Sequence, residues 1–177
     1  KYLSLVKKYI KKKKIKKYKI VLEPSKQNTA PAILAAALIK DIPNVQPLAI
    51  FPVDHLIDKT TIFNRIIIKN KKYLTHQNIF IFGIKPTSPS SEYGYFTTKK
   101  INGNINKVIK FIEKPKKIKA KDIIKKGAFW NSGMFFLRKD SLLNNYKIFQ
   151  PTIYLHCKNS VLNSRFKKNT YFLDKKH

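Results

Sequence analysis

Residues 108–136 read VIKFIEKPKKIKAKDIIKKGAFWNSGMFF, and this stretch decides the fold class. Two apolar runs, residues 108–112 and 134–137, lie on either side of a lysine-rich segment with helical spacing. Such runs are typical of strands, and Gly127 suits the end of a helix. Glu113 and Lys114 follow the first run, and Asn131 precedes the second. The pattern predicts strand, helix and strand, with polar side chains at the strand ends.

The polar residues at these strand ends have complementary chemistry. The Glu113 carboxylate accepts hydrogen bonds from two hydroxyls, Lys114 holds a phosphate as a point charge, and the Asn131 amide both donates and accepts. The set suits a phosphorylated polyol such as a sugar phosphate. A purely structural interpretation stays open, because Pro115 stops a strand ladder and residues 131–133 suit an ordinary turn.

The stretch resembles the sugar-binding half of the mannose-1-phosphate guanylyltransferases, also called GDP-mannose pyrophosphorylases. In that family a strand ends in Phe-Val-Glu-Lys-Pro, and a helix then leads to Trp-Asn-Ser-Gly-Met-Phe. This chain has Phe-Ile-Glu-Lys-Pro at 111–115 and Trp-Asn-Ser-Gly-Met-Phe at 130–135. Four further blocks match the family in the same order: Val-Leu-Glu-Pro (21–24) with Asn-Thr-Ala-Pro-Ala-Ile (28–33), Phe-Pro-Val-Asp-His (51–55), Phe-Gly-Ile-Lys-Pro-Thr (82–87) and Tyr-Gly-Tyr (93–95). Five blocks in one order make the resemblance specific.

The resemblance implies a fold and a reaction. The implied fold is α/β, a Rossmann-like nucleotidyltransferase of three layers, with a mostly parallel mixed sheet that is incomplete at both ends. The implied partners are GTP and mannose 1-phosphate, which the family converts to GDP-mannose and diphosphate with Mg²⁺. A homo-oligomer stays open.

The resemblance also implies roles for single residues. The sugar-phosphate site would be formed by Gly94, Glu113, Lys114 and Asn131. The guanine base would face Glu23 and the backbone of Asn28, Thr29 and Ala30. The catalytic residues would be Asp54, as the ligand of Mg²⁺, and Lys114. His55 is expected to brace its loop, since no second histidine lies at metal-ligand spacing.

The chain departs from the family pattern in several places. Gln27 stands where the family usually has Arg, and Glu92 stands where it has Gly. If the backbone at Glu92 needs a positive φ, that residue is strained. The family's Gly-rich phosphate-binding loop and its second metal-binding Asp have no counterpart here. We therefore expect an internal fragment of the catalytic domain, inactive in isolation. The alternative is a catalytically inactive remnant or sugar-phosphate-binding module.

The formal net charge is +29, from 38 basic and 9 acidic residues. A basic nucleic-acid-binding domain is therefore a second alternative. Readers of base edges and phosphates usually include arginine, and the basic residues here are lysines except for Arg65, Arg138 and Arg165. We favour a compositional bias toward lysine and expect no specific nucleic-acid partner.

The length of 177 residues allows one domain with a sizeable core. We expect a basic amphipathic helix over residues 1–17, a core over 18–165 and a tail without organisation over 166–177. A solvated face is expected for the basic helix, a membrane-surface helix is the sharper alternative, and no membrane partner is expected. The lone Cys157 excludes an internal disulfide. Without a signal peptide or an apolar run of membrane-spanning length, a cytoplasmic location is expected.

The remaining elements follow from periodicity and turn residues. Strands are predicted near 18–22, 47–53, 78–84, 107–112 and 134–138. Helices are predicted over 32–39, 60–73, 141–146 and 151–163, and a hairpin turn over 102–104. In the second helix, residues at helical spacing predict a face that belongs to the core: Ile62, Phe63, Ile66, Ile67 and Asn70.

Overall fold

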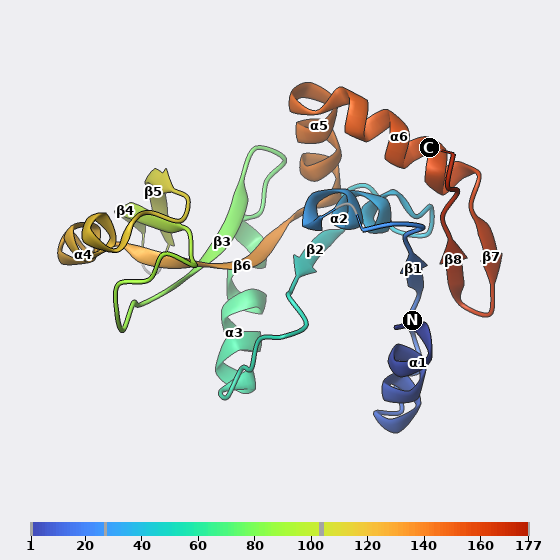
Figure 1. Cartoon of the computed structure of the whole chain (residues 1–177), viewed down its shortest axis with the longest axis horizontal. Coiled ribbons are helices and arrows are strands. Elements are labelled where there is room, and N and C mark those ends of the chain that lie inside the picture. Colours follow the sequence, from blue (N-terminus) through green and yellow to red (C-terminus); the bar gives the residue numbers. More distant parts are fainter. Residues whose placement is uncertain (1, 27, 103–104, 177) are drawn as a thin grey trace. The chain divides into compact units, whose positions relative to one another are not determined.

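The computed structural model describes residues 2–26, 28–102 and 105–176 and shows a mixed α/β protein (Figure 1). The chain forms two compact units where the sequence predicted one core. Unit 1 comprises Lys1–Gln46 and Arg138–His177, and unit 2 comprises Pro47–Leu137. Across the described ranges, no helix has both the length and the apolar character needed to cross a bilayer.

Unit 1 combines four helices with a small sheet. The helices are α1 (Leu3–Lys12), α2 (Thr29–Leu38), α5 (Lys139–Phe149) and α6 (Pro151–Leu162). The strands are β1 (Ile20–Leu22), β7 (Arg165–Lys167) and β8 (Thr170–Phe172), with β8 between the other two. Alanines at buried positions of α2 let α5 and α6 pack closely against it. A helix occurs at each of the four predicted places, but α1 is shorter than the helix expected over residues 1–17, and α5 is longer than the one expected over 141–146.

The hairpin of β7 and β8 corrects one prediction. Residues 166–177 were expected to lack organisation, yet β8 pairs with β7 in antiparallel and with β1 in parallel. Lys168 and Asn169 between them have φ of +47° and +60°. Two successive positive φ values are the geometry of a type I′ turn, whose twist matches that of the strands. Strands of three residues are too short to show alternation, so no clear periodicity marks them in the sequence.

A buried lysine fixes the end of α2 within unit 1. Lys139 is only 5% exposed. Its Nζ donates hydrogen bonds to the carbonyl oxygens of Ile42, at 2.6 Å, and Ile39, at 3.4 Å. Ile39 directly follows α2 and Ile42 lies in the turn after it, so Lys139 holds the segment that leaves the helix. Burial lowers the pKa of Lys139.

Unit 2 is built on a five-stranded sheet. Its strands are β2 (Pro47–Ile50), β3 (Ile79–Ile84), β4 (Tyr95–Asn102), β5 (Ile105–Ile112) and β6 (Phe129–Arg138). The order is β2-β6-β4-β5, and β3 also pairs with β6. Its helices are α3 (Thr60–Asn70), the short 3₁₀ helix η1 (Lys71–Tyr73) and α4 (Lys117–Lys125). The strand, helix and strand predicted for residues 108–136 are β5, α4 and β6.

The α/β class is confirmed, but the expectation of mostly parallel pairing needs correction. β4 pairs with β5 in antiparallel, and β6 runs antiparallel to both β3 and β4. β4 was not predicted as a strand, and its hairpin with β5 imposes the reversal of direction. The turn expected over 102–104 includes residues 103 and 104, which lie outside the described residues, as does Gln27.

One face of the unit 2 sheet packs against α4. The fully buried Tyr95 lies in a cluster with Ala120 and Ile123 of α4, and Ile112 and Trp130 pack against this cluster. Because side chains alternate along a strand, the next residues point to the opposite face. Tyr95, Ile112 and Trp130 thus face α4, and the residues next to each of them lie on the other face of the sheet.

Two boundaries in unit 2 differ from the sequence prediction. β2 ends at Ile50, although a strand was expected up to residue 53, and Val53 is fully exposed. Pro52 has no N–H to donate to a neighbouring strand, which explains the early end. β6 begins at Phe129, five residues before the predicted strand.

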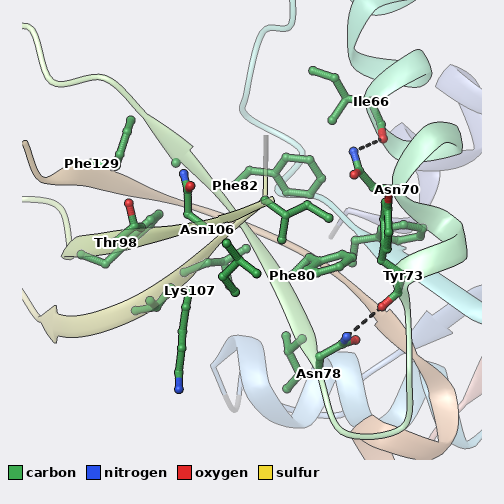
Figure 2. A pocket seen from close by; sticks show the side chains of 18 of the residues that line it. Ile66, Asn70, Tyr73, Asn78, Phe80, Phe82, Thr98, Asn106, Lys107 and Phe129 are labelled. Atoms are coloured by element: carbon green, nitrogen blue, oxygen red, sulfur yellow. Dashed lines mark hydrogen bonds between the residues drawn. The ribbon is translucent and has the colours of Figure 1, made fainter. Parts of the chain in front are cut away.

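The other face of the sheet borders a cavity of about 780 Å³ (Figure 2). Ile66, Ile67 and Asn70 of α3 line it together with aromatic residues of the sheet: Phe80, Phe82, Phe96, Phe129 and Phe136. The Asn70 amide is held by the Ile66 carbonyl oxygen, at 2.7 Å. The predicted face of α3 thus points toward the sheet, but none of its residues is buried. Open space replaces the filled core that we expected.

Candidate functional site

Three of the expected sugar-site residues lie side by side on neighbouring strands. The backbone N–H of Asn131 donates to the carbonyl oxygen of Gly94, at 2.8 Å. Ile112 at the end of β5 pairs with Tyr95, so Glu113 comes next to Gly94. The order across the sheet is therefore Asn131, Gly94, Glu113. We call these three residues the polar row.

Within the polar row, Gly94 and Glu113 approach closely. A Cβ atom on Gly94 would lie 2.8 Å from Oε2 of Glu113 and 2.8 Å from Cζ of Phe111. Real Cβ atoms do not come so close, so any larger residue at this position must displace the ends of these two side chains. Gly94 is buried, whereas the Glu113 side chain is exposed and open to a ligand. The contact also places the carboxylate on the face of the sheet opposite α4.

Asn131 is positioned by a β-bulge. Ile81 pairs with Phe135 and Gly83 with Asn131, so β6 carries extra residues opposite β3. Gly133 has a φ of +69°, and its N–H donates to Oδ1 of Asn131, at 3.2 Å. Bulges of this kind re-aim side chains beside functional sites. Asn-Ser-Gly is thus neither a simple turn nor a regular strand.

Lys114 directly follows the polar row in a strained conformation. Its φ is +39°, in the left-handed region that costs a residue with a side chain about 1–2 kcal/mol. Its side chain is exposed. Glu92, where the sequence suggested strain, is not among the described residues with positive φ. The backbone strain near this site therefore lies at the lysine.

Tyrosines flanking Gly94 hold the loop before the row. The Tyr95 hydroxyl donates to the Ser90 carbonyl oxygen and accepts from the Ser90 N–H, both at 2.9 Å. The Tyr93 ring lies 4.9 Å from the Trp130 ring, centroid to centroid. The Tyr-Gly-Tyr block thus ties the loop to the sheet on both sides of Gly94.

The expected nucleotide-site residues lie in unit 1 at the start of α2. Asn28 has φ +68° and ψ −177°, a region that is almost restricted to glycine. Its side chain makes no capping hydrogen bond to the helix. Thr29 begins the helix, and the Ala30 carbonyl oxygen accepts a hydrogen bond from the Tyr146 hydroxyl, at 2.8 Å. The start of α2 thus combines a strained backbone at Asn28 with a hydrogen bond from Tyr146 of α5.

Glu23 belongs to the same neighbourhood. Partial burial raises the pKa of Glu23. Burial and then the negative charge of Glu23 raise the pKa of Cys157, whose Sγ lies 3.9 Å from the Pro31 carbonyl oxygen. Burial and then Cys157 raise the pKa of Tyr146. Tyr146 and Cys157 therefore connect Glu23 with the first turn of α2, a role that their helical spacing alone did not reveal.

Asp54 is highly exposed. Its side chain is 83% exposed, and Nε2 of His55 lies 4.0 Å from its Oδ1. Among the described residues, no three His, Cys, Asp or Glu side chains form a group that could hold a metal ion. The preceding Pro52 lies near the bulge, 3.6 Å from where a Cβ of Gly133 would be. Asp54 thus offers a single exposed carboxylate in the same unit as the polar row.

The cavity of Figure 2 is separate from these candidates. Neither the polar row nor Lys114 or Asp54 is among the residues that line it. The cavity approaches the polar row at Gly83, which lines the cavity and pairs with Asn131. The cavity wall is mainly aliphatic and aromatic, which does not suit a sugar phosphate.

This chain belongs to the nucleotidyl transferase family, whose family model matches residues 1–175. It is 36% identical over 166 residues to a mannose-1-phosphate guanylyltransferase of Escherichia coli, covering 89% of this chain and 36% of that protein. It is 37% identical over 147 residues to the mannose-1-phosphate guanylyltransferase RfbM of Salmonella typhimurium, covering 80% and 31%. The chain thus spans about a third of the length of these relatives.

Solved structures agree with the fold. A crystal structure described as mannose-6-phosphate isomerase from Helicobacter pylori superposes with a TM-score of 0.85 at 29% identity, covering 99% of this chain and 68% of the other. One from Thermus thermophilus, described as mannose-1-phosphate geranyltransferase, has a TM-score of 0.72 at 20% identity, covering 86% and 51%. The second likeness concerns the fold alone.

Proposed function

We propose that the protein carrying this chain is a mannose-1-phosphate guanylyltransferase. A phosphate oxygen of mannose 1-phosphate attacks the α-phosphorus of GTP. The bond between the α-phosphorus and the bridging oxygen toward the β-phosphate breaks, and diphosphate leaves as GDP-mannose forms. The names of the relatives support this substrate pair. The polar row is the structural observation that carries the proposal.

The residues of unit 2 are assigned to the sugar phosphate. Glu113 accepts hydrogen bonds from sugar hydroxyls, and Asn131 donates to or accepts from another. Lys114 holds the phosphate, and its strained backbone sets the direction of the side chain. Gly94 leaves room for Glu113. Strand pairing orders the backbone beside Glu113 and Asn131 before the ligand arrives, which limits the free energy lost in ordering the site.

The residues of unit 1 are assigned to the nucleotide. Glu23 faces the guanine base, whose ring N–H and amino group are donors that a carboxylate accepts. The backbone of Asn28, Thr29 and Ala30 contacts the base, and Tyr146 holds that turn. Cys157 lies near enough to Glu23 to be affected by its charge, and Tyr146 holds the Ala30 carbonyl oxygen, so a change in either should alter the proposed base contacts.

Mg²⁺ is the proposed cofactor, with Asp54 as its protein ligand. A free carboxylate suits a hard cation, and Mg²⁺ is commonly bound through one or two carboxylates together with substrate phosphates and water. The fit is thus to an ion that arrives with the nucleotide. When bound, the ion neutralises charge on the phosphates.

The test is a coupled assay on the full product of the gene, with GTP, mannose 1-phosphate and Mg²⁺. We expect formation of diphosphate and GDP-mannose, and a loss of at least about 100-fold in kcat for Asp54→Asn. Glu113→Gln should raise KM for mannose 1-phosphate. Asp58→Asn and Glu92→Gln are matched controls, since both are exposed acids near these sites. Equal losses in the controls, or no product with the wild type, would contradict the proposal.

A further inference from the structure

Helix α1 has two chemically distinct sides. At 100° per residue, the apolar side chains of the helix and of Tyr2 before it fall within one arc of less than half the circumference: Tyr2, Leu3, Leu5, Val6, Tyr9 and Ile10. The opposite arc carries Ser4 and lysines: Lys7, Lys8, Lys11 and Lys12. Such a helix has a strong amphipathic character at low average hydrophobicity.

The apolar side of α1 is largely uncovered. None of its residues is buried, and Leu3 and Ile10, at one edge of the arc, are half-buried. The other four, which we call the apolar strip, are 41–64% exposed: Tyr2, Leu5, Val6 and Tyr9. Single exposed apolar residues are common, whereas a continuous strip along one helix marks a contact surface.

The charge around the strip indicates what covers it. The first 22 residues hold ten lysines and no acidic residue. Lys8 and Lys12 lie beside Leu5 and Tyr9 on the helix, and Nζ of Lys13 lies 5.8 Å from the centre of the Tyr9 ring. An anionic partner with an apolar layer beneath its charges would satisfy both sides of the helix. Nucleic acid would neutralise the lysines and leave the strip in water.

We propose that α1 is a membrane-surface helix that binds anionic phospholipid bilayers. The apolar strip enters the boundary between headgroups and acyl chains, tyrosines lie at headgroup level, and the flanking lysines meet lipid phosphates. The helix lies in the plane of the membrane, so no spanning segment is required. This surface differs from the sugar-phosphate and nucleotide candidates, and its occupation does not depend on the proposed activity.

The experiment measures binding to sonicated vesicles by co-sedimentation. One set is pure phosphatidylcholine, and the other contains 30% phosphatidylglycerol, a composition chosen as about that of an anionic bilayer. We expect binding to the anionic set at least about tenfold stronger than to the neutral set, weakened by salt. Equal partitioning into both sets, or none, would overturn the proposal.

Two double variants separate insertion from simple charge attraction. Leu5→Gln with Tyr9→Gln keeps the charge and should reduce partitioning by at least about tenfold. Lys8→Gln with Lys12→Gln should reduce it by about 10- to 30-fold. The matched control is Lys117→Gln with Lys121→Gln on α4, which removes the same charge from exposed sites and should have less than about threefold effect.

The same variants also test the other possible partners of α1, which are a second copy of the chain and nucleic acid. If the α4 control lowers binding as much as the α1 lysine variant, the attraction is unspecific and the proposal fails. If the Leu5→Gln and Tyr9→Gln variant binds vesicles like the wild type, the strip does not insert and the proposal fails. Sedimentation velocity adds a check, because a dimer that this variant converts to monomers would assign the strip to a second copy. Tighter binding to a 20-nucleotide oligomer than to anionic vesicles, about tenfold at 150 mM salt, would assign the lysines to nucleic acid.

Discussion

Replacing Gly94 with alanine should separate ligand binding from stability. The new Cβ would lie 2.8 Å from both Oε2 of Glu113 and Cζ of Phe111. Something must move, and the carboxylate is the exposed end of a flexible side chain. The φ of Gly94 is not in the left-handed region, so alanine fits the backbone. The substitution therefore acts mainly by displacing the Glu113 carboxylate.

The expected magnitudes follow from these contacts. Alanine at a compatible glycine position stabilises a protein by about 0.4–1 kcal/mol through the unfolded state, which offsets the local shift. The free energy of unfolding should therefore change by less than about 1 kcal/mol. A hydrogen bond to a charged group contributes about 1.5–3 kcal/mol, so the Kd for mannose 1-phosphate should rise by about 10- to 150-fold.

Gly127→Ala is the matched control for this prediction. Gly127 has a φ of +77° and no atom near the position of a Cβ, so alanine there suffers backbone strain without a clash. We expect a loss of about 1–2 kcal/mol in stability and no change in Kd. The two variants should thus have opposite profiles in urea unfolding and in calorimetric titration with mannose 1-phosphate.

A double-mutant cycle identifies the cause of the effect. In a Glu113→Ala background, Gly94→Ala should cause almost no further loss of affinity, because the displaced group is already absent. An unchanged Kd for Gly94→Ala, or a full additional loss in the double variant, would show that Gly94 does not act through the Glu113 carboxylate.

Three further substitutions test other parts of the structure. Lys114→Gly should raise the free energy of unfolding by up to about 1 kcal/mol, because it relieves left-handed strain. The affinity for mannose 1-phosphate should fall at least about tenfold. A loss of stability in this variant would contradict the strain. Lys139→Met should lower the free energy of unfolding by about 1–3 kcal/mol, because the partly buried Ile42 carbonyl loses its lysine donor and the Ile39 carbonyl keeps only the Ile42 N–H. Because burial lowers the pKa of Lys139 in the folded protein, the unfolded chain holds this proton more tightly. The contribution of Lys139 to the free energy of unfolding therefore grows as pH rises toward the ordinary pKa of 10.5. In urea unfolding, Lys139→Met should be less stable than the wild type by a larger margin at pH 10 than at pH 7. Tyr146→Phe should weaken GTP binding severalfold without affecting mannose 1-phosphate, and equal effects on both ligands in calorimetry would argue against its positioning role.

The sequence identified elements whose signal is local. β3 and β5 are apolar runs bounded by turn residues, and Pro151 indicates the first turn of α6, so all three elements were predicted. β4 was missed because lysines interrupt its pattern, although Thr97 and Thr98 favour a strand. The division into two units arises from long-range packing, which local periodicity does not encode.

The candidate residues and their grouping in one site were predicted from the family resemblance, whereas the backbone geometry around them was not predicted. The approach of Glu113 to Gly94 depends on the pairing of β4 with β5. The aim of Asn131 depends on a bulge that appears only when β3 lies beside β6. The positive φ of Lys114 could not be predicted, because lysine rarely adopts this conformation and glycine is the usual sign of it. These features belong to the paired sheet, so a single-strand pattern could not predict them.

The most direct test of the central claim is a ¹⁵N–¹H NMR titration of this 20.7 kDa chain with mannose 1-phosphate. We expect saturable shifts of four backbone amides, with a common Kd, and loss of those shifts in Glu113→Ala: Gly94, Glu113, Lys114 and Asn131. Inorganic phosphate should move mainly Lys114. Shifts confined to the lysines of α1, or none in the polar row at millimolar ligand, would contradict the assignment of a sugar-phosphate site.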